Sequence, residues 1–126
     1  MNFVSGTFLT QPDYIQTQLG TMILHETSGM GKLISELRKG TRPDARILYA
    51  KKEDLILAWC SCTDTPWFYW NQQDNPNRPE VQIYVRPELR RQGLGRSLIS
   101  QARTLWGSFS TCAWSQESHE FFRAVR

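Results

Sequence analysis

Residues 81–102 combine the residue types and spacing with the clearest chemical meaning in this chain. They comprise a short apolar run, a basic turn containing Gly93 and Gly95, and a long amphipathic stretch. Backbone N–H groups at a helix start point toward a bound anion, and the helix dipole favours negative charge there. Glycine lets the main chain approach a ligand that a Cβ would exclude. The pattern therefore predicts a binding site for the pyrophosphate of a nucleotide cofactor.

The cysteines and histidines do not show the spacing of a metal site. Cys60 and Cys62 share one face of a predicted strand, whereas Cys112 belongs to another segment. His25 and His119 lie in unrelated segments and complete no ligand set with them. We predict buried, reduced thiols, no disulfide framework and no metal.

Length and charge limit the classes of protein that remain. The chain has 126 residues, which suits one core, and we expect a single domain over residues 1–126. Its formal net charge of +3 is too small to indicate nucleic-acid binding, and a polyanionic small molecule explains it equally well. The sequence contains neither an apolar run of the ~20 residues that cross a bilayer nor a secretory signal. We expect no membrane partner and a cytoplasmic location.

The elements that must position the turn follow from hydrophobic periodicity. Strands are expected over 3–10, 47–50, 55–59, 81–85 and 109–114, and helices over 13–23, 32–39, 91–106 and 116–125.

Their order predicts how the strands pair. The two short apolar runs around residues 51–54 indicate an antiparallel hairpin. The strand, helix and strand over 81–114 should form a parallel unit, in which Leu94, Leu98, Ala102 and Leu105 make the apolar stripe of the helix. We therefore expect an α+β fold of three α/β/α layers, with a mixed, mostly antiparallel central sheet whose central strand is 81–85.

This segment closely resembles the acyl-coenzyme A binding motif of GNAT-type N-acetyltransferases. The family signature is Arg or Gln, two residues, Gly, one residue, then Gly or Ala, and Arg90, Gly93 and Gly95 match it. A dinucleotide fingerprint fits less well, because a third glycine is missing and the preceding strand is not the first. The resemblance implies an acyl-CoA N-acyltransferase fold with acetyl-CoA as co-substrate.

The resemblance also implies roles for the strand and the turn. Main-chain groups of Ile83, Tyr84 and Val85 would meet the pantetheine arm, and a bulge would part this strand from the next. The Val85 amide would bond the thioester carbonyl and stabilise the oxyanion as an amine attacks. Amides and arginines of the turn would hold the pyrophosphate. The residues implied there are Arg90, Arg91, Gln92, Gly93, Leu94, Gly95 and Arg96.

The C-terminal segment matches the family less closely. Ser115 stands where relatives have an asparagine and could still bond the pantetheine amides. Phe122 stands where many relatives have the tyrosine that protonates the departing thiolate. Tyr84, Ser118 and His119 are possible replacements, unless the thiolate leaves unaided or the protein is a weak enzyme.

A general base must deprotonate the acceptor ammonium before it attacks. Some relatives use a glutamate near the start of this strand, and Glu80 lies near that place. The alternative for Glu80 is an ordinary solvated residue after Pro79. His119 is the second candidate base.

We therefore predict an acetyl-CoA-dependent N-acetyltransferase that acts on an amine of a protein or small molecule by direct attack in a ternary complex. A covalent route lacks support, because no cysteine has an adjacent base motif. The alternative is a catalytically weak or inactive member of this fold that acts through protein–protein binding. The sequence ends at Arg126, where the family usually has a closing hairpin. We therefore expect an exposed sheet edge, completed by a homodimer, a partner protein or a bulky acceptor.

Overall fold

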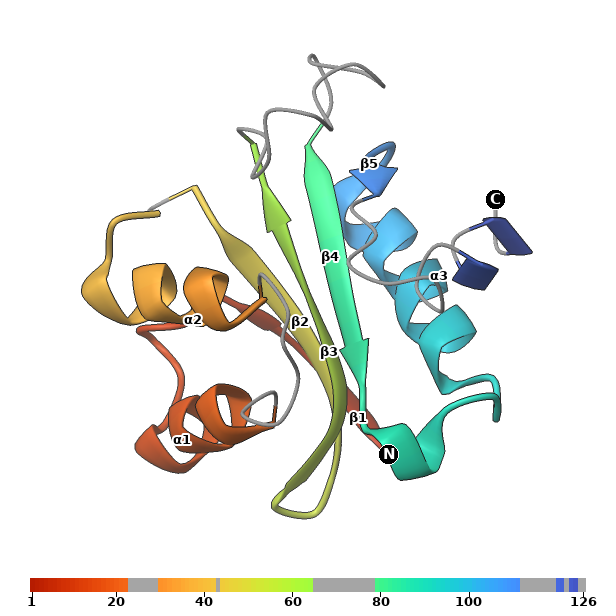
Figure 1. Cartoon of the computed structure of the whole chain (residues 1–126), viewed down its shortest axis with the longest axis horizontal. Helices are drawn as coiled ribbons and strands as arrows, with labels where there is room; N and C mark the ends of the chain where they lie inside the picture. The colour runs from red at the N-terminus through yellow and green to blue at the C-terminus, as the bar shows by residue number, and fades with distance from the viewer. Residues whose placement is uncertain (23–29, 43, 65–78, 112–119, 122, 125–126) are drawn as a thin grey trace.

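Five strands and three α-helices make up the part of the chain that the computed structural model describes (Figure 1). This part comprises residues 1–22, 30–42, 44–64, 79–111, 120–121 and 123–124, with only the backbone described at 30–33 and 110–111. The elements are β1 (Asn2–Gly6), α1 (Asp13–Thr21), α2 (Met30–Lys39), β2 (Arg46–Lys52), β3 (Leu55–Thr63), β4 (Glu80–Val85), the 3₁₀ turn η2 (Pro87–Leu89), α3 (Leu94–Trp106) and β5 (Ser110–Thr111).

The strands form one mixed sheet in the order β1-β2-β3-β4-β5. The first three pairings are antiparallel, and β4 pairs with β5 in parallel across the connection through α3. The α+β fold with a mostly antiparallel sheet and one parallel strand–helix–strand unit is thus confirmed. The middle strand of the sheet is β3, so the strand that we expected to be central lies one place nearer the β5 edge.

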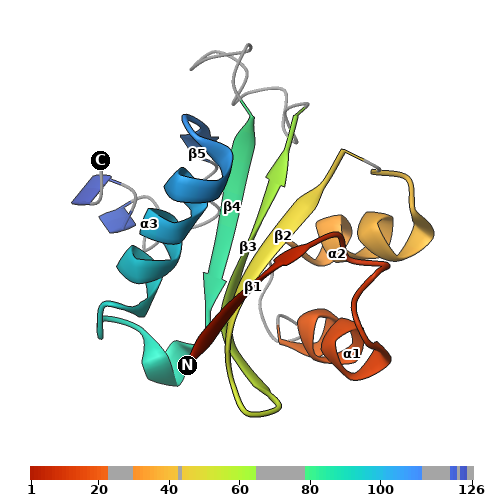
Figure 2. The same cartoon turned by 180° about the vertical axis from the view of Figure 1, so that it is seen from behind.

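Helices cover both faces of this sheet, which confirms the three layers (Figure 1 and, from behind, Figure 2). Successive side chains of a strand point to opposite faces, so each strand contributes to two cores. The core beneath α1 and α2 includes Ile15, Leu19, Ile34, Leu37, Tyr49, Trp59 and Tyr84. The core beneath α3 includes Leu48, Ala58, Cys60, Ile83, Leu98, Ile99 and Ala102.

Several boundaries differ from the sequence prediction. α3 begins at Leu94 rather than at Arg91, because Arg91 and Gly93 have φ of 65° and 85°, which a right-handed helix cannot include. β1 ends at Gly6, since a turn follows in which the Thr10 hydroxyl donates to the Thr7 carbonyl.

The last two predicted elements are described only in part. The strand expected over 109–114 is present at Ser110–Thr111, and residues 112–114 lie outside the described part of the chain. Of the helix expected over 116–125, residues 120–121 and 123–124 are described and are helical.

The buried stripe of α3 contains fewer residues than the spacing of apolar residues in the sequence predicts. Leu98 and Ala102 are fully buried, whereas Leu105 is 49% exposed and belongs to the outer face. We expect Leu98→Ala to lower the free energy of unfolding by about 2–5 kcal/mol, because it leaves a cavity under the helix. Leu105→Ala is the matched control and should change it by less than about 0.5 kcal/mol. Urea unfolding measures both, and equal losses would contradict this packing.

Candidate active site

The turn before α3 presents a row of backbone N–H groups without partners in the described part of the chain. The N–H of Arg90 donates to the Pro87 carbonyl, and the next backbone bond is that from Ser97 to Gly93, at 3.0 Å. No side chain caps the helix start at Gly93. The amides of residues 91–96 therefore remain available, as a helix N-terminus that binds an anion requires. This arrangement fits the diphosphate of coenzyme A.

The two glycines of the turn serve different purposes. Gly93 has a φ of 85°, and a Cβ built there meets no atom within 4 Å. It is needed for its left-handed backbone, which L-residues adopt at a cost. Gly95 is buried, and its Cβ would lie 3.0 Å from the Phe121 ring and 3.5 Å from Val85. Its smallness leaves room for the Phe121 ring to pack against the start of α3, a reason that the sequence pattern did not reveal.

Over the half of β4 nearest this turn, no described strand pairs with one of its edges, which we call the open edge. The Arg86 N–H donates to the Leu57 carbonyl at 3.2 Å, so these two residues form a hydrogen-bonded pair. The next pair along the strands, Ala58 and Val85, is therefore a non-hydrogen-bonded pair. Because hydrogen-bonded pairs alternate in an antiparallel ladder, the main-chain groups of Ile83 and Val85 point away from β3. β5 pairs only with Glu80 and Val81 and lies beside the start of β4 (Figure 1).

The same alternation gives Tyr84 a different role from its neighbours. Its backbone faces β3, opposite Trp59, and its hydroxyl donates to the Met22 carbonyl at 2.6 Å. Main-chain contact between Tyr84 and the pantetheine arm is therefore not supported by the register of β4.

The bulge expected in β4 is absent from its pairing with β3. That register is unbroken from Glu80 to Val85, and the register shift of the sheet lies between β2 and β3, at Ala50 and Lys51.

Arg90 ties the turn to the strand. Its Nε donates to the Val85 carbonyl at 2.8 Å, and its guanidinium lies 5.4 Å from the centroid of the Tyr84 ring. Its side chain therefore holds the turn against β4. Arg91 and Arg96 are exposed beside the available amides and are better placed to add positive charge for a phosphate.

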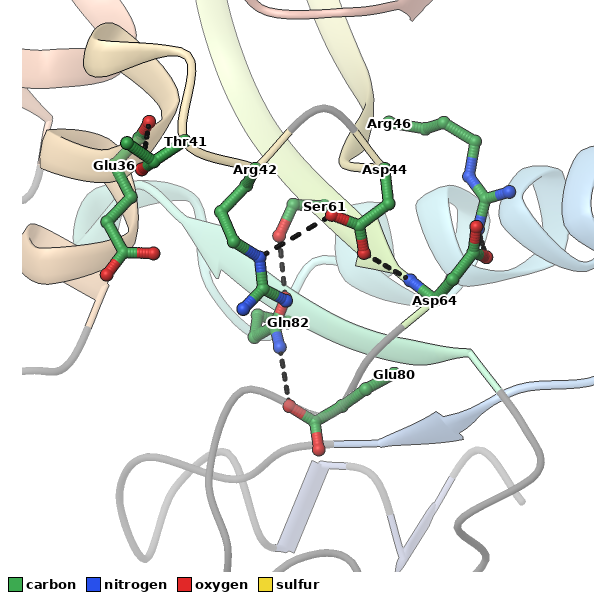
Figure 3. Close-up of polar contacts among 9 residues, drawn as sticks. All are labelled: Glu36, Thr41, Arg42, Asp44, Arg46, Ser61, Asp64, Glu80 and Gln82. Atoms are coloured by element: carbon green, nitrogen blue, oxygen red, sulfur yellow. Dashed lines mark hydrogen bonds and ion pairs between the residues drawn. The ribbon is translucent and has the colours of Figure 1, made fainter.

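Glu80 is buried rather than solvated, with 2% of its surface exposed. The Gln82 side-chain amide donates to the Glu80 Oε1 at 2.8 Å, and the Ser61 hydroxyl donates to the Gln82 Oε1 at 2.7 Å (Figure 3). Sequence reasoning missed Ser61 and Gln82. The signal that could have identified them is the alternation of polar residues in otherwise apolar strands.

The two predicted catalytic residues that the structure describes are not brought together. Glu80 and Val85 are the first and last residues of β4, about 17 Å apart at the usual rise of a strand. The Ile83 amide points in the same direction as that of Val85 and lies nearer to Glu80 along the strand. The remaining predicted site residues, Ser115 and His119, lie outside the described residues, as do Ser118 and Phe122.

Both described cysteines are buried thiols, as the sequence predicted. Burial raises the pKa of Cys60 well above its usual range. Burial also raises the pKa of Cys62, although the Arg46 guanidinium, which donates to its Sγ at 3.0 Å, partly offsets this effect. Neither thiol is therefore poised as a thiolate at neutral pH.

We expect Cys60 and Cys62 to resist a thiol reagent at pH 7.5. Reaction needs an exposed thiolate, so labelling in the folded protein should be at least about 100-fold slower than after denaturation. Peptide mapping by mass spectrometry reports each cysteine separately. Rapid labelling of Cys60 in the native protein would contradict this placement.

The described residues contain neither a membrane-spanning helix nor a metal-binding cluster. Among the helices that the structure describes, none has both the length and the apolar character that crossing a bilayer requires. In the same residues, His, Cys, Asp and Glu side chains do not gather into a group that could hold a metal ion.

Solved structures with a similar fold include acetyltransferases. An aminoglycoside antibiotic 6'-N-acetyltransferase from Acinetobacter haemolyticus is similar with a TM-score of 0.66 and 21% identity, over 99% of this chain and 89% of that one. A ribosomal-protein-alanine N-acetyltransferase from Brucella melitensis biovar Abortus 2308 has a TM-score of 0.60 and 13% identity, over 99% and 91%. A predicted acetyltransferase with acetyl-CoA from Clostridium acetobutylicum has a TM-score of 0.55 and 13% identity, over 98% and 86%.

At these identities the similarity establishes the fold alone. A comparison with curated protein sequences found no match. The family described as the acetyltransferase (GNAT) family, however, matches residues 8–123, which is most of the chain. Enzymes of this family use acetyl-CoA, the cofactor for which the turn is suited. The chain therefore belongs to the GNAT acetyltransferase family.

Proposed function

We propose that this protein transfers the acetyl group of acetyl-CoA to an amine of a protein or small molecule, by direct attack within a ternary complex. The observation that carries the proposal is the row of amides at residues 91–96, which have no partner among the described residues, beside the edge of β4 that no described strand covers. The buried, neutral thiols of Cys60 and Cys62 favour direct attack over a covalent acyl-enzyme.

The residues of the turn and strand would hold the cofactor as follows. The amides of residues 91–96 receive the diphosphate, with the exposed Arg91 and Arg96 beside it. Ile83 and Val85 offer main-chain groups to the pantetheine arm at the open edge of β4. Bound acetyl-CoA supplies an activated acetyl thioester.

Two main-chain amides are candidates to stabilise negative charge on the acetyl oxygen. The Val85 amide faces the open edge, and so does the Ile83 amide, which lies closer to Glu80. A preorganised N–H aimed at a developing oxyanion is the type of group that lowers acyl-transfer barriers.

Glu80 is the proposed general base. It is a buried carboxylate at the start of β4, held by a hydrogen bond from Gln82. It would accept the proton of the acceptor ammonium, directly or through water. His119 remains the second candidate for this role.

Two measurements on the full chain test the proposal. Isothermal titration with acetyl-CoA should show binding, and a thiol reagent should detect coenzyme A release when an amine is added. The names of similar enzymes suggest the first acceptor panel, which comprises aminoglycosides and peptides with an N-terminal alanine. An absence of acetyl-CoA binding would exclude the proposal. Binding without coenzyme A release across a broad amine panel would favour the alternative of a non-enzymatic member that binds another protein.

The proposed partners beyond the cofactor also need a solution test. β1 and β5 are the edges of the sheet in the described residues. A homodimer or partner protein that pairs with such an edge is expected to appear in sedimentation or cross-linking experiments.

A further inference from the structure

The buried polar residues of the described part of the chain gather in one place. They are Ser61, Thr63, Glu80 and Gln82. In the register of β3 and β4, Ser61 lies opposite Gln82 and Thr63 lies opposite Glu80. These four residues form a square on the sheet face beneath α1 and α2, directly beyond the apolar pair of Trp59 and Tyr84. Burying polar groups is costly unless hydrogen bonds compensate, so this polar square calls for an explanation.

Three of the four side chains form a directed chain of hydrogen bonds. The Ser61 hydroxyl donates to the Gln82 Oε1 at 2.7 Å, and the Gln82 Nε2 donates to the Glu80 Oε1 at 2.8 Å (Figure 3). An ionised carboxylate only accepts hydrogen bonds, so its neighbour must be the NH₂ end of the amide. Ser61 reinforces that orientation of Gln82 from the other side. Thr63 differs, because its buried hydroxyl has no hydrogen-bond partner among the described residues.

Charged groups lie at the same end of the sheet, on both of its faces, since Arg46 contacts Cys62, which belongs to the core beneath α3. Arg42 and Asp44 come from the segment before β2, and the Arg42 Nε lies 3.6 Å from an Asp44 oxygen. The Asp64 amide donates to Asp44 at 2.9 Å, and Arg46 donates to the Asp64 carboxylate at 2.8 Å (Figure 3). These four charged groups are the same in all of the variants described below. They therefore do not account for differences in Glu80 titration or turnover between the variants.

We propose that Gln82, oriented by Ser61, is a positioning residue that holds the Glu80 carboxylate in one orientation and favours its ionised form. The inference rests on the proposed role of Glu80 as general base. Its physical basis is that a hydrogen bond donated to a carboxylate favours the charged state and restricts the rotamer. A base held in this way needs no reorientation before it accepts the acceptor's proton.

Three variants of the full chain test this positioning role. Gln82→Met removes the donor at similar size, and Ser61→Ala removes the hydroxyl that orients it. Thr63→Val is the matched control, because it deletes a buried hydroxyl on the same face that bonds to no described residue. Circular dichroism checks that each variant folds, and Ser61→Ala serves if Gln82→Met does not fold.

The first readout is the titration of Glu80, followed by NMR of the ¹³C-labelled carboxyl group and assigned with Glu80→Gln. We expect its midpoint to move to higher pH in Gln82→Met, by a smaller amount in Ser61→Ala, and not in Thr63→Val. The second readout is turnover. We expect kcat to fall about tenfold in Gln82→Met and about threefold in Ser61→Ala, with KM for acetyl-CoA unchanged.

The proposal is overturned if Gln82→Met leaves the Glu80 midpoint unchanged, or if Thr63→Val shifts it as much as Ser61→Ala does. A fall in kcat without the titration shift also overturns it, because Gln82 would then act through packing alone. Failure of the proposed function gives a different result. In that case the wild type releases no coenzyme A with any amine, while the titration still decides the relation between Gln82 and Glu80.

Discussion

Replacing Gly93 with valine is expected to weaken acetyl-CoA binding about 100-fold while leaving the fold intact. Gly93 has a φ of 85°, and a β-branched residue is an outlier in that region. Holding valine there costs on the order of 1–3 kcal/mol, so the turn should relax and redirect its amides away from the diphosphate. A tenfold loss of affinity corresponds to about 1.4 kcal/mol, so a 100-fold loss corresponds to about 2.8 kcal/mol, the upper end of that cost. Isothermal titration measures it.

Two comparisons separate this effect from general destabilisation. Gly93→Asn should keep affinity within a few-fold, because asparagine tolerates the left-handed conformation far better than valine does. A Cβ at this position meets no neighbouring atom, so the cost of substitution lies in the backbone alone: the valine variant should unfold at a moderately lower temperature and the asparagine variant close to the wild type. If valine and asparagine bind acetyl-CoA equally well, the backbone of the turn is not what grips the cofactor.

Glu80→Gln should reduce kcat about 100-fold, the low end of the range for losing a general base. The amide is nearly isosteric with the carboxylate but cannot accept a proton at neutral pH. Affinity for acetyl-CoA should be unchanged, because Glu80 begins β4 and the turn follows its other end. Steady-state kinetics with a saturating amine, together with cofactor titration, tests both parts.

The exposed Glu53, in the turn between β2 and β3, supplies the control for this substitution. Glu53→Gln removes the same charge far from the proposed base and should leave kcat at the wild-type value. Full turnover by Glu80→Gln would remove Glu80 from the mechanism and shift attention to His119. A parallel loss of acetyl-CoA affinity would instead mean that Glu80 supports the fold of β4 as a whole.

Much of the fold could be predicted from the sequence because the signals are local. The β2–β3 hairpin follows from two apolar runs around a four-residue polar break, and Gly40 and Gly107 take positive φ just after the ends of α2 and α3, as glycines at helix ends commonly do. The turn before α3 was recognisable for the same reason, since its glycines and basic residues lie within a few positions of one another. The family motif therefore indicated the cofactor, and predicts where it binds, without any long-range contact.

The sequence by itself determined which elements form and which turn presents its amides, because backbone preferences act over a few residues. Only the tertiary structure decided that Glu80 is buried and bonded to Gln82, and that Gly95 must be small because Phe121 packs on it. Those facts depend on the register between β3 and β4 and on a chain segment 26 positions away from Gly95. Such contacts arise only when distant segments pack together, and local residue patterns do not specify that packing.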